Sequence, residues 1–444
     1  MSIRAKLPAN VEQFYTDLRA LPLPGRQRRL PEIGWIETEC SYGPSIISQQ
    51  KYIKHLQFSG FNNQEITTYS HMTAINFASS THNPVFLEDI QAAFRKDTAT
   101  VLKTCRQMIV DHYQGGVSVD SIIFLPDGTG PTAVFQQAIQ ADYWFMPDEL
   151  GSGTAKAAQV KGHYSQTIHL SHRDSAGSPQ DYLQEVIDKY QQINRQKPKA
   201  KFAIQIGVPS KTGLIPQRLD QFLRQSTNWP NLFILIDAVQ WRHFDQIKPE
   251  GNIAVAGSFS KFLSSAAFAG FIVLPEKLRT IQDQTDPALL FRLAEAQERI
   301  QAVFALESKQ KQQISQELAR FTITKLDQYL GGSIELDPSY QATPTIFCFR
   351  PRITGNITDP EMLKEIGRRY IGFMSSPYST SSEMTDQLSF IPAAPVGGLW
   401  RFALSGQQIV KAATEKGMVE MKTVIDVFLK KHRHLDFHSL KHGF

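Results

Sequence analysis

The sequence lacks the features that mark membrane and disulfide-rich secreted proteins. It has three cysteines, at positions 40, 105 and 348, which favours reduced thiols in a cytoplasmic protein over a disulfide framework or a metal cluster. No apolar run approaches the roughly 18 residues of a membrane helix, and the first residues lack the apolar core of a secretory signal. We therefore expect a cytoplasmic protein with no membrane partner.

The sequence also lacks a strong charge of one sign. The formal net charge of +5 is spread along 444 residues, so it does not indicate a nucleic-acid partner. There is no internal repeat and no G-x-G-x-x-G dinucleotide fingerprint. A hydrophobic content of 41% is ordinary for a globular protein, and the length is enough for one large α/β domain and a smaller one.

Two short apolar segments each lead to a side chain that could take part in chemistry. Residues 232–236 (LFILI) predict a buried strand, and Asp237 follows it directly. Residues 253–256 predict a second strand, which continues through Gly-Ser-Phe-Ser to Lys261. Because open α/β sheets bind ligands at the carboxyl ends of their strands, we expect Asp237 and Lys261 to share one site.

A carboxylate and an amine in one site are what pyridoxal phosphate (PLP) requires. Its aldehyde forms a Schiff base with a lysine, and a carboxylate keeps its pyridine nitrogen protonated. Small and apolar residues follow Lys261, and desolvation there favours the neutral, nucleophilic amine. Taken singly, Asp237 could cap a turn and Lys261 could lie on the surface. Their occurrence at successive strand ends favours the cofactor site.

A glycine-containing turn precedes these strands. Residues 121–125 predict a strand, and Thr129-Gly130-Pro131-Thr132 then open a helix. The free N–H groups and partial positive charge of a helix start can hold a phosphate, and proline suits the first helical turn. A simple turn between a strand and a helix is the alternative interpretation.

The motifs around these residues resemble those of one enzyme family. Asp237-x-x-Gln240, followed by Ser258-x-Ser260-Lys261, is similar to the D-x-x-Q and S-x-[HS]-K elements of the class V aminotransferases. This group of fold-type I PLP-dependent enzymes includes cysteine desulfurases, kynureninases and several aminotransferases. The interval between Asp237 and Lys261 is close to that of class V, and the resemblance covers roughly residues 74–410.

The resemblance implies a fold and an assembly. The fold is the three-layer α/β fold of fold-type I enzymes, with a mostly parallel sheet in the large domain and a smaller α+β domain at the C-terminus. We expect an N-terminal arm at residues 1–73, a large PLP-binding domain at 74–310 and a small domain at 311–444. The family also implies a homodimer.

The resemblance further assigns roles around the cofactor. It makes Lys261 the catalytic Schiff-base lysine, Asp237 the partner of the pyridine nitrogen and Gln240 a hydrogen-bonding partner of the 3-oxygen. The phosphate would be held by residues of the turn and of the segment before the lysine: Thr129, Gly130, Pro131, Thr132, Ser258 and Ser260. Pro131 stands where the family has alanine.

The resemblance implies three further contacts, and for each of them the sequence leaves an alternative or departs from the family pattern. The ring that stacks on the cofactor is His163 or Tyr164. Ser210 stands where the family has asparagine, which weakens a contact to the 3-oxygen or the substrate. Arg401, in an apolar segment at 399–405, would bind the substrate carboxylate bidentately; an internal ion pair is its alternative role. Ser405 lies two positions later than the family pattern places its serine.

The chemistry expected is transamination of an amino acid or related amine. A cysteine desulfurase is disfavoured, because no cysteine follows Cys348 to serve as its mobile nucleophile. A PLP-dependent lyase acting by β-elimination or C–C cleavage is one alternative, and a non-catalytic PLP-fold binding protein is another. The four histidines near the C-terminus are more typical of a solvated tail than of a metal site, so we expect no metal there.

Residues outside these motifs carry weaker patterns. Apolar spacing predicts a helix at 85–94, another at 98–113 and a long helical region at 287–330. Residues 345–349 and 399–405 predict strands in the small domain.

Overall fold

The computed structural model describes part of the chain in two compact units. We call one the sheet unit (residues 98–260 and 268–293) and the other the helical unit (residues 1–97, 261–267 and 294–444). The described residues are 27–30, 35–38, 46–47, 85–86, 96–114, 116–125, 130–148, 166–174, 178–210, 212–238, 247–259, 270–278, 287–329, 334–336, 346–351, 400–404 and 406–431. The predicted domain boundaries after residues 73 and 310 stay a prediction.

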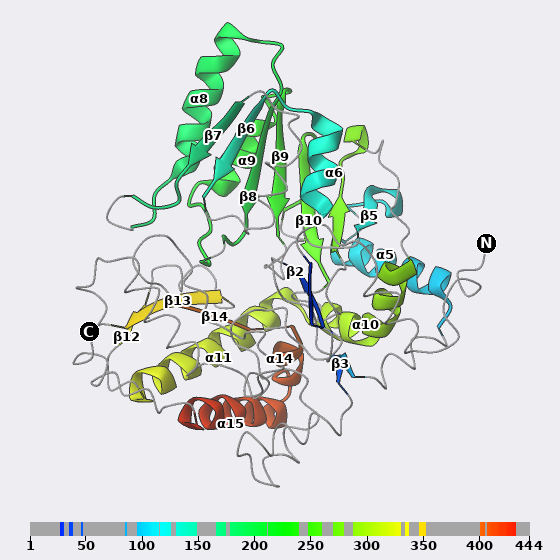
Figure 1. The fold of residues 1–444 in the computed structure, drawn as a ribbon, viewed down its shortest axis with the longest axis vertical. Helices are drawn as coiled ribbons and strands as arrows, with labels where there is room; N and C mark the ends of the chain where they lie inside the picture. Colours follow the sequence, from blue (N-terminus) through cyan, green and yellow to red (C-terminus); the bar gives the residue numbers. More distant parts are fainter. Residues whose placement is uncertain are drawn as a thin grey trace. The chain divides into compact units, whose positions relative to one another are not determined.

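The sheet unit is built on a seven-stranded sheet with the order β5-β11-β10-β9-β8-β6-β7 (Figure 1). Strand β11 runs antiparallel to both of its neighbours, and the other strands are parallel to one another. The strands are β5 (Ile122–Leu125), β6 (Tyr143–Pro147), β7 (Gln166–Leu170), β8 (Phe202–Gly207), β9 (Leu232–Asp237), β10 (Ile253–Ser258) and β11 (Gly270–Val273). The prediction of a mostly parallel sheet is confirmed.

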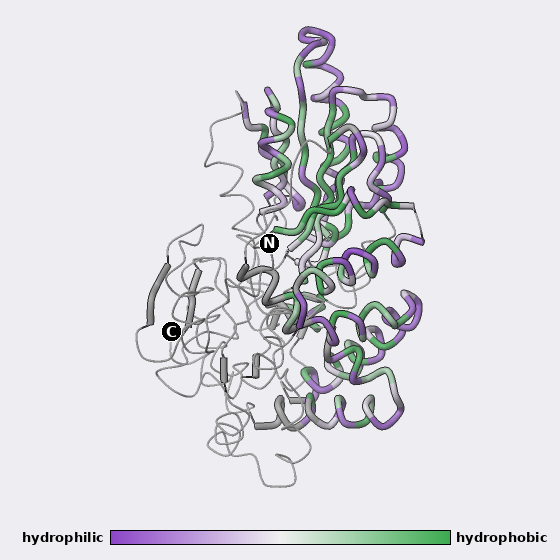
Figure 2. Tube along the Cα trace, turned by 90° about the vertical axis from the view of Figure 1, so that its right-hand side faces the viewer, coloured by the Kyte–Doolittle hydropathy of each residue, from purple (hydrophilic) through white to green (hydrophobic). Residues whose placement is uncertain are grey.

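Helix α6 (Gly130–Ile139) covers one face of this sheet. Its Val134, Phe135 and Ile139 pack in one buried cluster with residues of β5, β8, β9, β10 and β11, among them Leu235 and Ala256. Figure 2 shows the apolar strands at the centre of the unit and hydrophilic residues on its outer turns. Burial of these apolar side chains is the main driving force for this packing.

Helices α5 (Thr98–His112) and α8 (Tyr182–Gln196) cover the opposite face. The guanidinium of Arg106 on α5 lies 5.5 Å from the ring centre of Phe124. Tyr190 on α8 packs edge-on against Phe202, with ring centres 5.0 Å apart. Phe124 and Phe202 alternate along their strands with residues of the α6 face, so they point away from α6. The short helix α9 (Leu219–Ser226) follows β8 in the chain. With helices on both faces of the sheet, the unit has the predicted three layers.

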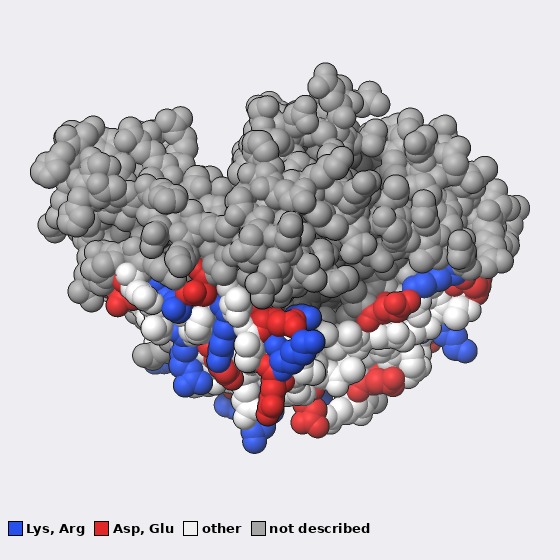
Figure 3. Space-filling model, turned by 90° about the horizontal axis from the view of Figure 1, so that it is seen from below, with Lys and Arg blue, Asp and Glu red and all other residues white. Residues whose placement is uncertain are grey.

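The helical unit contains a three-stranded antiparallel sheet and several helices. Its strands are β12 (Ile334–Leu336), β13 (Ile346–Pro351) and β14 (Trp400–Ala403), in that order. Helix α11 (Ser308–Tyr329) packs against α15 (Glu415–Lys431) and α14 (Gly406–Lys411). Ion pairs join Lys325 to Asp426 and Glu317 to Lys422 across α11 and α15. Acidic and basic residues lie intermixed on the described surface visible in Figure 3.

One predicted helix needs correction, and one predicted helical region divides into two helices. Val85 and Phe86, expected to begin a helix, form strand β4, which pairs in parallel with β3 (Ile46–Ile47). A partner distant in the sequence therefore overrides the local helical spacing, and positions 87–94 lie outside the described residues. The helical region at 287–330 is two helices, α10 (Pro287–Ala305) and α11, with a break at Leu306 and Glu307.

Two further strands, β1 (Gln27–Leu30) and β2 (Trp35–Thr38), pair antiparallel within residues 1–73.

Among the described helices, none is long and apolar enough to cross a membrane.

Candidate active site

Asp237 is the buried polar residue at the carboxyl end of central strand β9. It is 7% exposed. In the sheet it pairs with Gly207 of β8 on one side and Ala256 of β10 on the other. Gln205 Nε2 donates a hydrogen bond to Asp237 Oδ2 over 2.9 Å. A carboxylate is thus held at the edge of the sheet where open α/β folds bind ligands.

Ser258 ends the neighbouring strand β10 and lies in a continuous row across the sheet. It pairs with Gly270 of β11, which in turn pairs with Leu125 at the end of β5. At a strand spacing of about 4.8 Å, this row brings the end of β5 to about 10 Å from Ser258. Helix α6 starts five residues after Leu125, at Gly130. The chain therefore enters α6 within five residues of the edge that these strand ends form.

Asp237, Ser258 and Gln205 also share one face of the sheet. Paired residues on adjacent strands point to the same side, and side chains alternate along each strand. Asp237 pairs with Ala256, two residues before Ser258, and Gln205 pairs with Leu235, two residues before Asp237. Leu235 and Ala256 belong to the cluster packed against α6, so all three polar side chains lie on the α6 face.

The first turn of α6 completes this arrangement, which we call the strand-end site: Thr132, Gln205, Asp237 and Ser258. Thr132 is buried, at 2% exposed, and Pro131 occupies the first turn, where its missing N–H costs nothing. The first N–H groups of a helix have no partner within the helix, and its start carries a partial positive charge. This end of the strand-end site suits a phosphate, and the Asp237 end suits a cationic nitrogen.

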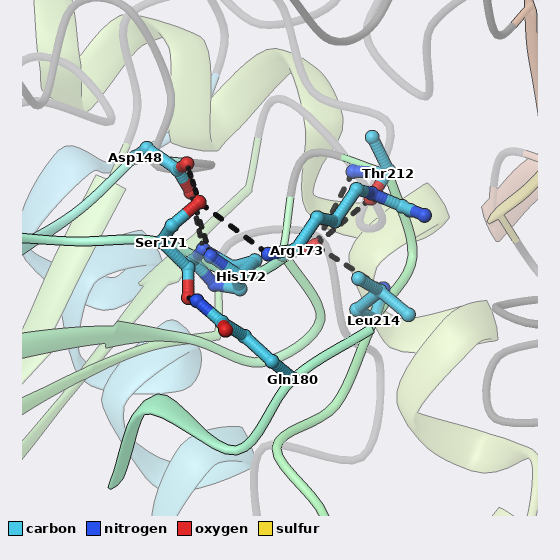
Figure 4. A network of polar contacts seen from close by, with 8 residues as sticks. Asp148, Ser171, His172, Arg173, Gln180, Thr212 and Leu214 are labelled. Carbon is cyan, nitrogen blue, oxygen red and sulfur yellow. Dashed lines mark hydrogen bonds and ion pairs between the residues drawn. The ribbon is translucent and has the colours of Figure 1, made fainter. Parts of the chain in front are cut away.

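A second polar network lies at the ends of β6 and β7 (Figure 4). Asp148 accepts hydrogen bonds from Ser171 Oγ at 2.6 Å and from the backbone N–H of His172 at 3.0 Å. His172 Nδ1 lies 2.9 Å from the same carboxylate, and its ring packs on Tyr182 with centres 4.6 Å apart. Burial alone raises the pKa of Asp148, but the hydrogen bonds from His172 and Ser171 outweigh it and lower the pKa from 3.8 to about 2.

The loops after β7 and β8 are joined by a buried arginine. Arg173 Nη2 donates to Thr212 Oγ1 over 3.1 Å, and both residues are buried. Ser210 Oγ accepts the N–H of Leu214 at 3.1 Å, so this hydroxyl also shapes its own loop. Figure 4 shows the side chain of Arg173 reaching from one loop toward Thr212 on the other. Asp148, His172, Arg173 and Thr212 are not among the site residues that the sequence motifs predict.

The described part of the chain contains about half of the predicted site residues. Gly130, Pro131 and Thr132 open α6, Asp237 and Ser258 end adjacent strands, and buried Ser210 follows β8. Arg401 lies on β14 opposite Cys348, in the helical unit. The remaining predicted residues lie outside the described part: Thr129, His163, Tyr164, Gln240, Ser260 and Lys261.

Comparison with known proteins gives similarity at the level of structure. No family model and no curated protein matches the sequence. A solved structure of a lysine-to-alanine mutant of C-DES, with glycine covalently linked to its PLP cofactor, is 11% identical with a TM-score of 0.55, covering 82% of this chain and 99% of the other. Two further structures are similar at a lower score.

The first of these is a sphingosine-1-phosphate lyase from Burkholderia pseudomallei, at 9% identity and a TM-score of 0.49, with 88% and 86% of the two chains covered. The second is an archaeal alanine:glyoxylate aminotransferase, at 14% identity and a TM-score of 0.47, with 89% and 95% covered. The fold is established by the seven-stranded sheet, its single antiparallel strand and the C-DES structure. The chain has the fold of the fold-type I PLP-dependent enzymes.

Proposed function

We propose that the protein binds pyridoxal 5'-phosphate and is an aminotransferase acting on an amino acid or a related amine. One observation carries the proposal: buried Asp237 lies on the same sheet face and at the same edge as Ser258 and the first turn of α6. An anion for a ring nitrogen and a helix start for a phosphate are thereby set at the two ends of one site. This donor set fits PLP.

The described residues have separate tasks in this proposal. When bound, PLP supplies an aldehyde that condenses with amines and a protonated ring that withdraws electrons from the substrate Cα. Asp237 holds the proton on the ring nitrogen, because an adjacent carboxylate favours the charged form. Thr132 and Ser258 would donate hydrogen bonds to the phosphate, together with the first N–H groups of α6.

Residues outside the described part, and Arg401, complete the proposal through the motifs that they match. Lys261 would bind the aldehyde carbon and would serve as the general base for the Cα proton. Gln240 and Ser210 would contact the 3-oxygen, and Ser260, Thr129, Gly130 and Pro131 would hold the phosphate. His163 or Tyr164 would stack on the ring. Arg401 binds the substrate carboxylate with its two-pronged guanidinium.

The finer assignments rest on the same motifs. We propose that the chain is a class V enzyme, works as a homodimer and resides in the cytoplasm. The molar mass in solution, measured by light scattering, tests the dimer directly. A mass of one chain, with PLP bound and turnover intact, would exclude it.

The first experiment is a visible absorption spectrum of the protein incubated with PLP, recorded beside that of Lys261→Ala. We expect a yellow species in the parent that the variant does not form. Amino acids are then screened for a spectral change and for their products. A ketoacid together with pyridoxamine phosphate supports transamination, whereas ammonia or a side-chain fragment indicates a lyase. A protein that binds PLP but responds to no amine would be a binding protein, and one that binds no PLP would exclude the proposal.

A further inference from the structure

Gln205 is a buried polar side chain on β8 that contacts the carboxylate at the end of β9. It is 1% exposed, and its Nε2 lies 2.9 Å from Asp237 Oδ2. We propose that Gln205 is a positioning residue. Its amide holds the Asp237 carboxylate in place and keeps it ionised for the ring nitrogen of the cofactor. This inference rests on the proposed function and adds a residue to its machinery.

The sheet register explains why a glutamine can do this. Gln205 pairs with Leu235, which lies two residues before Asp237 on the same strand and the same face. Two residues of strand span about 6.6 Å, which a long side chain lying along the sheet can cover. Gly207, the residue directly opposite Asp237, brings no side chain of its own. The amide of Gln205 therefore reaches Asp237 from one row back.

The chemistry of the contact favours an ionised Asp237. An amide N–H donated to a carboxylate stabilises its charged form, and hydrogen bonds to charged groups are the stronger ones in proteins. The second atom of the same amide, Gln205 Oε1, is buried and has no hydrogen-bond partner in the described part of the chain. Its contact with Asp237 is therefore the hydrogen bond that orients this side chain.

The surroundings make a purely structural role a poor explanation. Apart from Asp237 and Ser258, the neighbours of Gln205 on this face include the apolar residues Ala203, Leu235, Ala254 and Ala256. A buried amide with an unsatisfied oxygen costs stability that an apolar side chain would not. Locally unfavourable choices of this kind are expected where function requires them. We infer that the amide is present at this position for Asp237.

The test is a double-mutant cycle on PLP affinity. Gln205→Met keeps the length of the side chain and removes the donor, and Asp237→Asn removes the charge that the donor serves. The dissociation constant for PLP is measured by titrating the cofactor-free form of the parent, both single variants and the double variant. In the parent background we expect Gln205→Met to raise this constant by about tenfold. In the Asp237→Asn background we expect a change below about twofold, because the charge that the amide stabilises is already lost.

Two further variants guard against general damage to the fold. Gln205→Asn keeps the amide on a shorter stem, and we expect it to weaken PLP binding as Gln205→Met does. Tyr190→Phe removes a hydrogen bond to Asn231 Oδ1, which precedes the other end of β9, and we expect unchanged PLP affinity. Circular dichroism and thermal unfolding report whether each variant is folded.

The PLP titrations have three possible outcomes for the role of Gln205. A tenfold loss that is confined to the background with Asp237 supports the inference. An equal loss in both backgrounds, or no loss in either Gln205 variant, overturns it while the proposed function stands. A parent that binds no PLP overturns both.

Discussion

Gly257 on β10 lies directly beneath the aromatic ring of Phe271 on β11, so that a β-carbon at position 257 would overlap that ring. Phe271 also packs against Phe259, with ring centres 4.9 Å apart, and Phe259 packs against Phe124 at 5.7 Å. These rings support the end of β10, from which the chain continues toward Lys261. The glycine is required there because the ring occupies the space of a side chain.

We predict that Gly257→Ala destabilises the protein by about 1–3 kcal/mol, the usual cost of overpacking a filled core. Chemical denaturation measures the loss. Phe271→Leu is the matched background, since it removes part of the ring that the new methyl group meets. The alanine should cost less there than in the parent. Equal costs in the two backgrounds would contradict this account of the glycine.

Asp148 should make the stability of the protein sensitive to acid. Its pKa is about 2 in the folded state against an ordinary value of 3.8, so the stabilisation is fully present above about pH 4 and is lost as the pH falls toward 2. The Asp148 side chain is 42% exposed. After allowance for solvent screening, we expect a contribution of about 1 kcal/mol.

Unfolding free energies of the parent and of Asp148→Asn, measured between pH 2 and 6, test this point. The difference between them should shrink as the pH falls through that window. Ser171→Ala removes one of the hydrogen bonds to Asp148 and should reduce the effect in part. Parallel pH profiles of parent and Asp148→Asn would show that the carboxylate is not stabilised in the folded state.

Thr132 should contribute to cofactor affinity through its hydroxyl. Thr132→Val keeps the shape of the side chain and removes the donor, and we expect the dissociation constant for PLP to rise by about tenfold or more. Thr322→Val is the matched control, because Thr322 is also buried on a helix but its hydroxyl bonds to the backbone of Leu318. That variant should bind PLP like the parent. Equal affinities of all three proteins would remove Thr132 from the site.

Arg401 should separate substrate binding from cofactor binding. With Arg401→Lys we expect PLP affinity close to that of the parent and a rise of at least about tenfold in the KM for an amino acid, since lysine cannot make the bidentate contact. The KM for the amino acid and the dissociation constant for PLP are both measured for the parent and for Arg401→Lys. A variant that loses PLP and substrate affinity together would place the arginine in a structural role.

The sequence predicted the buried central strands β9 and β10 better than the half-exposed edge strand β7. Residues 232–236 and 253–256 are apolar runs, and they form β9 and β10 in the buried middle of the sheet. Strand β7 has the sequence QTIHL and is half exposed at the sheet edge, so it carries no continuous apolar signal. Strand β4 depends on pairing with residues almost forty positions earlier, which local patterns do not record.

Among the site residues too, local sequence patterns reveal some and miss those that depend on a neighbouring strand. Asp237 and Ser258 could be found because each ends an apolar run in a spaced motif. Gln205 lies inside a strand, and its role depends on the neighbouring strand that places Asp237 within reach. Asp148 and His172 follow two strands that were not predicted, and their contact exists because parallel strands end at the same edge.

The central claim of the proposed function is that Lys261 anchors PLP, and one measurement tests it most directly. The protein is loaded with PLP, reduced with borohydride to fix any Schiff base, digested and mapped by mass spectrometry, with Lys261→Ala treated in parallel. We predict one stoichiometric pyridoxyl modification on the peptide that contains Lys261, and none on the variant. An unmodified Lys261, or incorporation spread equally over surface lysines in both proteins, would contradict the account.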